Sequence, residues 1–451
     1  MAASATVGER LESGRSSELD RRVRGLVTRI SLGGWFEMYD LFMAAYVSLG
    51  LVREGLFTSM GTGIAAFAAF VGSGFAGMFA GTLIFSWVSD RFGRRAAFTW
   101  SLLFYSLATL FMAVMPNALL IDVCRFLAGI GIGVQIITID AYVSEITRAE
   151  ARGRLIAYSQ FISYTAVPAV ALLSLLFVPH VYAGLAGWRI VTLIGALGAI
   201  FVWPIRAGLP ESPRWLESRG RSEDAERALR EFAFGRPGFR SASYSAVRPA
   251  AELPHVSGVV YLKRTIALVV FNFFQTIGFY GFASWVPILL VQNGVSFVHD
   301  LQYVLVIAFA NPFGPLVAIA AAERFERKWQ IVGLAAAIAL LGLAFAASRT
   351  ATAIIGFGIL ITLANNWFSC AFHAYQAELY PTRVRARAVG FVYSWSRFSS
   401  IFVGYWIALV LGRYGVPGVF VLIAVAMTLA AAVIAIYGPK TNSVSVEVLA
   451  P

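Results

Sequence analysis

The chain has 451 residues, of which 59% are hydrophobic and 13% are charged, and its mean hydropathy is +0.73. Soluble globular domains carry about 25% charged residues, so this composition excludes a soluble globular protein. The formal net charge of +12 would suit a nucleic-acid binder, but all except six of the 36 basic residues gather near the termini, in four short loops and in one connector. The positive-inside rule accounts for this bias, so we expect no nucleic-acid partner.

Apolar stretches of 18 or more residues recur along the chain, and each is long enough to cross a hydrocarbon core of about 30 Å. Lipid cannot satisfy backbone polar groups, so these stretches are predicted to be helices. The first 25 residues lack an apolar stretch followed by a small-residue cleavage site, so we expect no cleaved signal peptide. The predicted spans are 26–50, 64–88, 97–115, 119–143, 155–178, 188–205, 264–291, 300–322, 329–347, 351–377, 386–411 and 416–437.

These spans predict an all-α membrane protein with twelve transmembrane helices in two six-helix halves. In the connector, Ser222 precedes acids and helically spaced Ala and Leu residues, which predicts a surface helix. The predicted regions are a cytoplasmic tail (1–25), the first half (26–205), a cytoplasmic connector (206–263), the second half (264–437) and a second cytoplasmic tail (438–451).

An internal repeat supports the two halves. The loop SDRFGRR, which begins at Ser89, recurs as AERFERK, and AYVSE ending at Glu145 recurs as AYQAE ending at Glu378, both at an offset of 233 residues. Six spans in each half give the halves the same orientation, as in transporters whose halves are related by an axis along the membrane normal. We therefore expect a substrate site between the halves, near mid-membrane.

Charged residues inside the spans are the first candidates for function, because a charge at the membrane centre costs about 2.5–3.5 kcal/mol on insertion scales. The helical depths of Asp40 and Arg125 permit an ion pair. One hypothesis is that Asp40 takes up and releases a proton with Arg125 as its partner; the alternative is a permanent pair that locks two helices together. Glu37, one turn from Asp40, is either a second acid or a polar wall.

Arg397 lies near mid-membrane and has no acid close to it in its own span. A guanidinium in a central cavity can hold a carboxylate through two parallel hydrogen bonds, so Arg397 is the candidate anchor for an anionic substrate. The alternative is that it pairs with Glu37 or Asp40. The further candidates for the substrate site are Gln275, Tyr280, Trp395 and Gln160.

The remaining chemistry-bearing residues do not indicate an enzyme. The four His and two Cys are scattered, with neither metal-ligand spacing nor a nucleophile beside a base, so we expect no catalytic site, metal or cofactor. Cys124 and Cys370 fall inside predicted spans and are interpreted as apolar residues. His373 occupies the repeat position of Asp140, where a gate contact is favoured over ligand binding.

Three motifs together resemble the major facilitator superfamily over essentially the whole chain: SDRFGRR, the glycine-spaced RFLAGIGIGV that begins at Arg125, and PESPRWL that begins at Pro210. The resemblance is to the branch of sugar porters, metabolite and aromatic-acid proton symporters, and organic-ion transporters. It implies alternating access with a latch of charged residues on the cytoplasmic side. By motif match the latch comprises Asp90, Arg91, Arg94, Arg95, Glu145 and Arg152 in the first half and Glu323, Arg327, Glu378 and Arg387 in the second.

The resemblance also bears on the substrate. Sugar porters carry two adjacent glutamines in span 7, whereas this chain has the single Gln275 there; its span-11 arginine, Arg397, is more similar to the organic-ion and aromatic-acid relatives. We therefore expect a proton-coupled symporter of a small organic anion, such as an aromatic carboxylate, in a bacterial inner membrane. It is expected to be a monomer with both termini in the cytoplasm, energised by the proton gradient. The alternatives are a sugar or polyol symporter and an organic-ion exporter.

Overall fold

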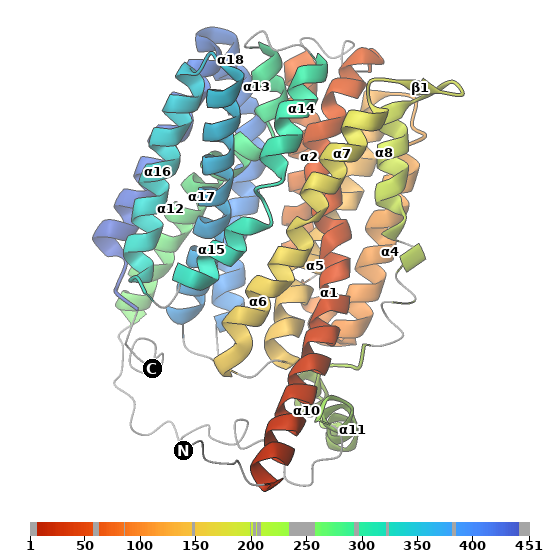
Figure 1. Cartoon of the computed structure of the whole chain (residues 1–451), viewed down its shortest axis with the longest axis vertical. Coiled ribbons are helices and arrows are strands. Elements are labelled where there is room, and N and C mark those ends of the chain that lie inside the picture. The colour runs from red at the N-terminus through yellow and green to blue at the C-terminus, as the bar shows by residue number, and fades with distance from the viewer. Residues whose placement is uncertain are drawn as a thin grey trace.

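The computed structural model describes most of the chain as two groups of long helices standing side by side (Figure 1). The described residues are 7–56, 63–84, 86–146, 149–198, 200–201, 204, 209–233, 258–292, 297–321, 324–380 and 385–441. Eight helical segments among them are long and apolar enough to cross a membrane, and one of these, Ala388–Tyr437, is long enough for two crossings.

The predicted spans correspond to helices throughout the described residues. The first half contains α1 (Val7–Arg53), α2 (Gly63–Ile84), α3 (Ser86–Phe92), α4 (Arg94–Met112), α5 (Ala118–Ile146), α6 (Ala149–Tyr164), α7 (Ala166–Phe177) and α8 (Gly187–Ala196). The second half contains α12 (Gly258–Ala283), α13 (Val286–Gln292), α14 (Phe297–Ala308), α15 (Phe313–Ala321), α16 (Arg327–Ala347), α17 (Ala351–Glu378) and α18 (Arg385–Tyr437). A small hairpin of β1 (Val181–Tyr182) and β2 (Leu185–Ala186) precedes α8.

Several predicted spans are interrupted. Thr165 separates α6 from α7 within one span, and a turn at Trp285 separates α12 from α13. The pair α14 and α15 is separated at Asn311, just before a proline, which cannot continue a helical hydrogen-bond ladder. In α18 the chain reverses at Gly415, whose φ of 65° suits glycine, so α18 holds both of the last two spans.

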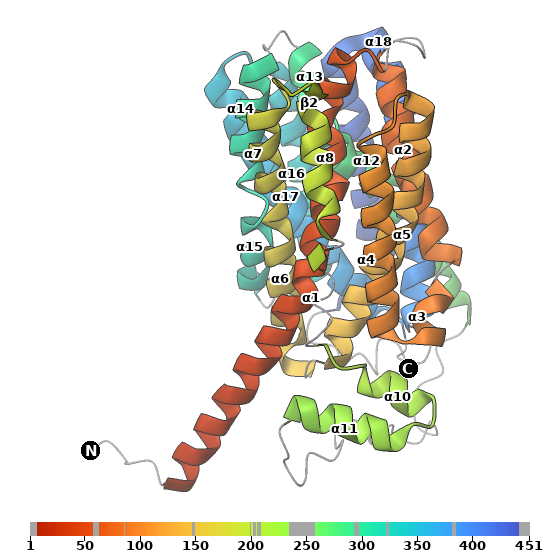
Figure 2. The ribbon, with the colours of Figure 1, turned by 90° about the vertical axis from the view of Figure 1, so that its right-hand side faces the viewer.

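The connector lies beside the end of the molecule that carries both termini, as Figure 2 shows. It contains α10 (Pro213–Ser218) and α11 (Ser222–Ala233), which confirms the predicted surface helix. Leu216, Ala225 and Ala228 pack together against Leu26 of α1. Residues 7–25, which belong to the predicted cytoplasmic tail, are helical and continue into the first span as part of α1, and no proline interrupts them.

The glycine-spaced motif of α5 is explained by close packing on two sides. A Cβ on Gly129 would lie 2.2 Å from the backbone oxygen of Gly74 in α2, and one on Gly133 would lie 2.4 Å from that of Met78. Gly131, between them in sequence, faces α4 instead and sits against Tyr105. Glycines at every second position therefore let α5 approach α2 and α4 closely, which places Arg125 at the start of the motif inside this half.

The internal repeat is visible in a shared hydrogen bond. The Tyr142 hydroxyl donates to the backbone oxygen of Pro210, and the Tyr375 hydroxyl donates to that of Pro439 at 2.8 Å. These two tyrosines occupy the same place in AYVSE and AYQAE, again 233 residues apart. Each half thus ties the end of its fourth span to the segment that follows its sixth.

Candidate functional site

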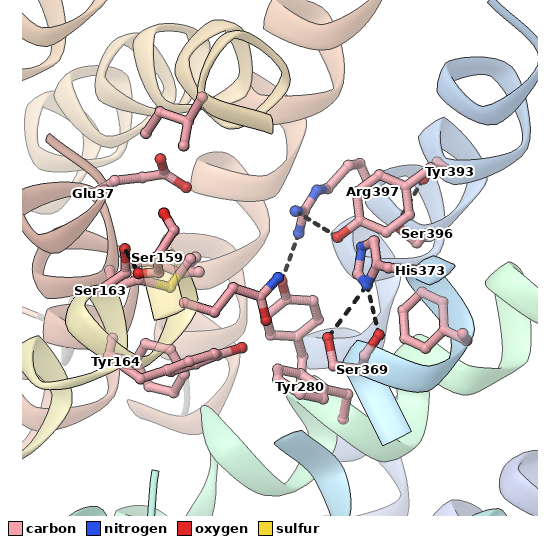
Figure 3. Close-up of a pocket in the computed structure, with 18 of the residues that line it drawn as sticks. Glu37, Ser159, Ser163, Tyr164, Tyr280, Ser369, His373, Tyr393, Ser396 and Arg397 are labelled. Carbon is pink, nitrogen blue, oxygen red and sulfur yellow. Dashed lines mark hydrogen bonds between the residues drawn. The ribbon is translucent and has the colours of Figure 1, made fainter. Parts of the chain in front are cut away.

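A cavity lies between the two halves, and its walls carry polar and aromatic side chains from both (Figure 3). Its volume is about 90 Å³, several times the roughly 10–15 Å³ needed to hold one water molecule. The lining residues are Gly34, Glu37, Met38, Leu41, Phe42, Ile139, Ser159, Gln160, Ser163 and Tyr164 from the first half and Gln275, Phe279, Tyr280, Ser369, Phe372, His373, Tyr393, Ser396 and Arg397 from the second.

Arg397 is the central cation of this cavity and is only 3% exposed. Its Nη1 donates to the Tyr280 hydroxyl at 2.5 Å, and its Nη2 donates to the Tyr393 hydroxyl at 3.0 Å. Both tyrosine rings also lie within cation–π distance, at 5.7 Å and 5.0 Å from the guanidinium carbon to the ring centroid. In this structure Arg397 is therefore bound by two neutral phenols.

This arrangement orients the Tyr280 hydroxyl. An arginine N–H can only donate, so the phenol oxygen accepts from it and the phenol hydrogen points elsewhere. Arg397 and Tyr280 both line the cavity and both carry hydrogen-bond donors, which are the groups that a carboxylate requires.

Glu37 stands on the opposite wall, on α1, facing Arg397 across the cavity (Figure 3). It is 2% exposed, and its charge acts electrostatically on Arg397. The cavity thus has a cationic wall from the second half and an acidic wall from the first.

Asp40 and Arg125 form the predicted ion pair. Arg125 Nη1 lies 2.5 Å from Asp40 Oδ2, and the Thr109 hydroxyl donates to Asp40 Oδ1 at 2.8 Å. Asp40 is fully buried and Arg125 is 3% exposed. The pair sits among α1, α4 and α5 rather than on the cavity wall, so Arg397 does not pair with Asp40 in this structure.

The other predicted substrate residues divide into two groups. Gln275, Tyr280 and Gln160 line the cavity, and Cys370 of the second half donates its thiol to Gln160 Oε1 at 3.3 Å. Trp395 is not among the lining residues, because its ring packs against Phe391 and Phe398 on another face of α18.

The predicted latch is only partly within the described side chains. Arg327 and Glu378 form an ion pair of 2.8 Å. Arg91 is exposed, while the guanidinium of Arg94 donates to Ser89 at 3.2 Å. Arg95 is half-buried, and the other five members have side chains outside the described residues: Asp90, Glu145, Arg152, Glu323 and Arg387.

Glu211, in the PESPRWL motif, is a polar contact that sequence reasoning missed. Its Oε1 accepts the backbone N–H groups of Arg94 and Arg95 at 2.8 Å and 3.2 Å, and so caps the start of α4. Gly93 has a φ of 98°, and a Cβ there would lie 2.3 Å from the Glu211 carboxylate. The glycine of the loop motif and the glutamate of the later motif therefore form one structural unit. The two motifs are far apart in the sequence, so the sequence alone does not show this contact.

The sequence favours a gate contact over ligand binding for His373, and in the structure its ring lines the cavity. Its ring stacks on Phe372 at 4.2 Å between centroids and meets the Tyr393 ring at 4.9 Å. A ring that contacts an Arg397 partner in this way belongs with the substrate-site candidates.

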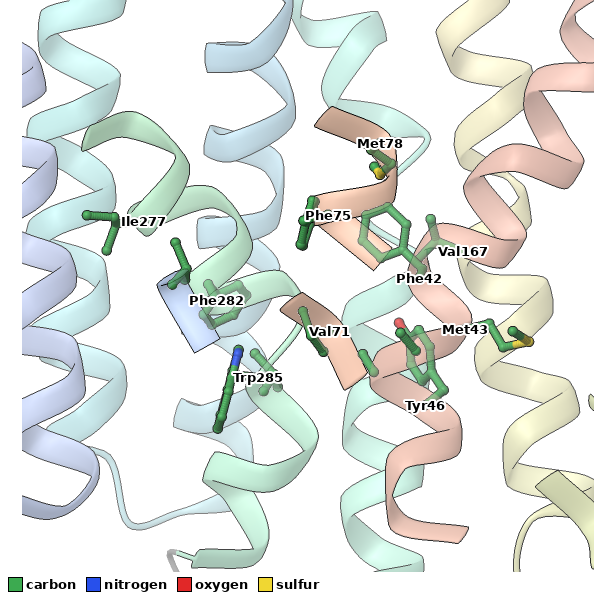
Figure 4. Packing of buried hydrophobic residues seen from close by; sticks show 14 of the residues in the cluster. Phe42, Met43, Tyr46, Val71, Phe75, Met78, Val167, Ile277, Phe282 and Trp285 are labelled. Atoms are coloured by element: carbon green, nitrogen blue, oxygen red, sulfur yellow. The ribbon is translucent and has the colours of Figure 1, made fainter. Parts of the chain in front are cut away.

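Apolar packing joins the halves on the side of the cavity opposite the chain termini. Phe67 of α2 meets Trp285 at 4.8 Å, and Phe75 of α2 meets Tyr280 at 4.5 Å between ring centroids. Figure 4 shows part of this packing, with Tyr46 from α1 and Phe282 from α12 nearby. The halves are thus in contact at this end through aromatic side chains.

Comparisons with known proteins agree with this architecture. Residues 26–450 match the model of the family described as "Sugar (and other) transporter". The chain is 30% identical to the niacin transporter NiaP of Acinetobacter baylyi, covering 93% of this chain and 94% of the relative. It is 27% identical to a gentisate transporter of Corynebacterium glutamicum, covering 88% and 84%. A partially occluded inward-open structure of the xylose transporter XylE from E. coli superposes with a TM-score of 0.77 at 18% identity, covering 94% and 99%.

Proposed function

We propose that the chain, which belongs to the Sugar (and other) transporter family, is a proton-coupled symporter of a small organic anion. It is a multi-pass membrane transporter with the major facilitator fold. The observation that carries the proposal is Arg397: a buried guanidinium on the cavity wall, held by two neutral phenols. A carboxylate entering beside it gains charge-assisted hydrogen bonds from an anchor that is already desolvated.

The aromatic lining supports a planar, partly apolar anion. Phe279, Phe372, Tyr164 and Tyr280 line the same cavity as Arg397, and ligand sites commonly combine apolar walls with a few polar anchors. Two relatives are named as transporters of niacin and of gentisate, and these compounds indicate the kind of solute to test first.

Proton coupling rests on the Asp40–Arg125 pair and on Glu37. A fully buried carboxylate that shares its charge with an arginine and a threonine can exchange a proton when the helices around it move apart. Glu37, on the cavity wall one turn away, gives the first half a second acid that faces the solute. We propose a bacterial inner membrane as the location, with both termini cytoplasmic, since the basic loops favour that orientation.

Thermal stabilisation of the purified protein tests the substrate class, because a ligand that binds only the folded form raises its apparent melting temperature. We expect benzoate-like carboxylates to raise it by a few degrees, and amines and sugars to leave it unchanged. Arg397→Gln should abolish the effect, whereas Arg349→Gln, at an exposed position outside the cavity, should retain it. Stabilisation by sugars alone would overturn the anion proposal in favour of a sugar porter.

A further inference from the structure

The His373 side chain is fixed in one orientation at the edge of the cavity. Its Nδ1 lies 2.8 Å from the backbone oxygen of Ser369 and 3.4 Å from the Ser369 hydroxyl, one helical turn earlier on α17 (Figure 3). Stacking on Phe372 holds the ring plane. The side chain therefore turns one nitrogen back toward its own helix.

That contact determines which ring nitrogen carries the proton. A backbone carbonyl oxygen can only accept, so a nitrogen 2.8 Å from it must be an N–H donor. In the neutral imidazole the other nitrogen, Nε2, is then a lone-pair acceptor. Within the part of the chain that the structure describes, Nε2 makes no hydrogen bond, while the ring lines the cavity.

The cavity therefore combines donors with an aromatic acceptor. Arg397 and Tyr280 line the cavity with N–H and O–H donors, and His373 Nε2 can accept an O–H or N–H from a ligand in the same cavity. A polar site group left without its partner is unfavourable, so a ligand that lacks the donor is bound less tightly.

From this we infer that His373 determines specificity: it selects carboxylates that also carry a hydrogen-bond donor over those that carry none. The inference rests on the proposed function, because it assumes that the carboxylate binds at Arg397. It adds the second recognition element and assigns it to one atom of one residue.

The test compares ligands of one shape with and without a donor. Binding of benzoate, of the three monohydroxybenzoates and of nicotinate, whose ring nitrogen is an acceptor, is measured by calorimetry on the purified full chain. We expect at least one hydroxybenzoate to bind about five- to tenfold more tightly than benzoate, and nicotinate to bind no more tightly than benzoate. His373→Phe keeps an aromatic ring against Phe372 but removes the acceptor, so it should bring the hydroxybenzoate and benzoate affinities together.

His180→Phe is the matched control, since His180 is exposed and does not line the cavity; it should retain the preference. Equal binding of benzoate and all hydroxybenzoates by the unmodified chain would overturn the inference while leaving the anion site intact. The same conclusion follows if His373→Phe keeps the preference. Failure of every carboxylate to bind would remove the proposed function and this inference together.

Discussion

Asp40 and Arg125 neutralise each other inside the first half, and Thr109 satisfies the second carboxylate oxygen. Such a pair serves either as a proton site or as a fixed brace between α1 and α5. Removing one partner distinguishes the two roles only if folding is followed separately, because breaking a buried pair commonly costs about 3–5 kcal/mol.

We predict that Asp40→Asn abolishes proton-driven accumulation in vesicles but leaves counterflow exchange of labelled substrate. The asparagine keeps an acceptor for Thr109 and cannot exchange a proton, so exchange without net proton movement continues. The double variant Asp40→Asn/Arg125→Gln, which leaves no unpaired charge at this pair, controls for lost stability in a melting experiment. If accumulation and exchange fall equally in a variant that remains folded, the pair is a brace and not a proton site.

The sequence predicted this pair because both residues are charges in apolar helices, whose depth follows from helical rise alone. It likewise singled out Arg397, Gln275 and Tyr280, which the cavity brings together. It did not predict that His373 lines the cavity or that Trp395 lies on another face of its helix. The direction of a side chain around a helix depends on how that helix packs. The role of Glu211 was not predicted either, because the backbone groups that it caps in α4 lie more than a hundred residues away in the sequence.

At the scale of the elements, the ion pair of Arg327 and Glu378 joins the first residue of α16 to the last residue of α17. Each charge has the same sign as the partial charge at its own helix end and is therefore disfavoured there, so the attraction of the partner charge is needed to stabilise it. Burial raises the pKa of the Glu378 carboxyl, and the Arg327 charge lowers it only in part, so the pKa stays above its ordinary value.

The sign of the resulting pH dependence follows from linkage. An acid whose pKa is higher in the folded chain binds its proton more tightly there, so ionisation of Glu378 lowers stability as the pH rises above the unfolded value of about 4.3. Arg327 opposes this loss only while Glu378 is ionised. We predict that Arg327→Gln has little effect at pH 4.5 and lowers the apparent melting temperature increasingly toward pH 8.

The measurement is a melting series in detergent between pH 4.5 and 8.5. Glu378→Gln should flatten the dependence and remain within about 1 kcal/mol of the unmodified chain at pH 7, since partly exposed pairs contribute little. Arg324→Gln, an exposed arginine of the same loop, is the control and should follow the unmodified chain. A loss with Arg327→Gln that is the same at every pH would show that the arginine acts through packing and not through Glu378.

The elements themselves were largely predictable, because hydropathy and length identify membrane spans almost independently of tertiary structure. The breaks within them were not predicted, although α12 and α14 end at Ala283 and Ala308, four residues before Pro287 and Pro312, whose ring nitrogens have no hydrogen to donate to those carbonyl oxygens. The glycines of α5 were visible as a motif, but only the structure assigns Gly129 and Gly133 to α2 and Gly131 to α4.

For the whole molecule, the alternating access that the family resemblance implies requires the two halves to separate at one end and meet at the other. Toward the end opposite the chain termini, α2 and α18 meet without room for side chains: a Cβ on Gly72 would lie 2.9 Å from the backbone oxygen of Ile401, and one on Gly404 would lie 3.1 Å from Ala68. A large residue at either position must push the halves apart at this seam, because backbone atoms cannot move aside as a flexible side chain can.

We therefore predict that Gly72→Trp abolishes uptake into cells while ligand-induced thermal stabilisation persists. The substitution excludes the conformation described here but leaves Arg397 and its tyrosines in place within the second half, so binding survives without alternation. Gly333→Trp is the matched control, since no atom lies within 4 Å of a Cβ at that exposed position, and it should transport normally. Normal uptake by Gly72→Trp would mean that closure of this seam is not part of the transport cycle, and loss of both uptake and binding would mean that the seam also shapes the substrate cavity.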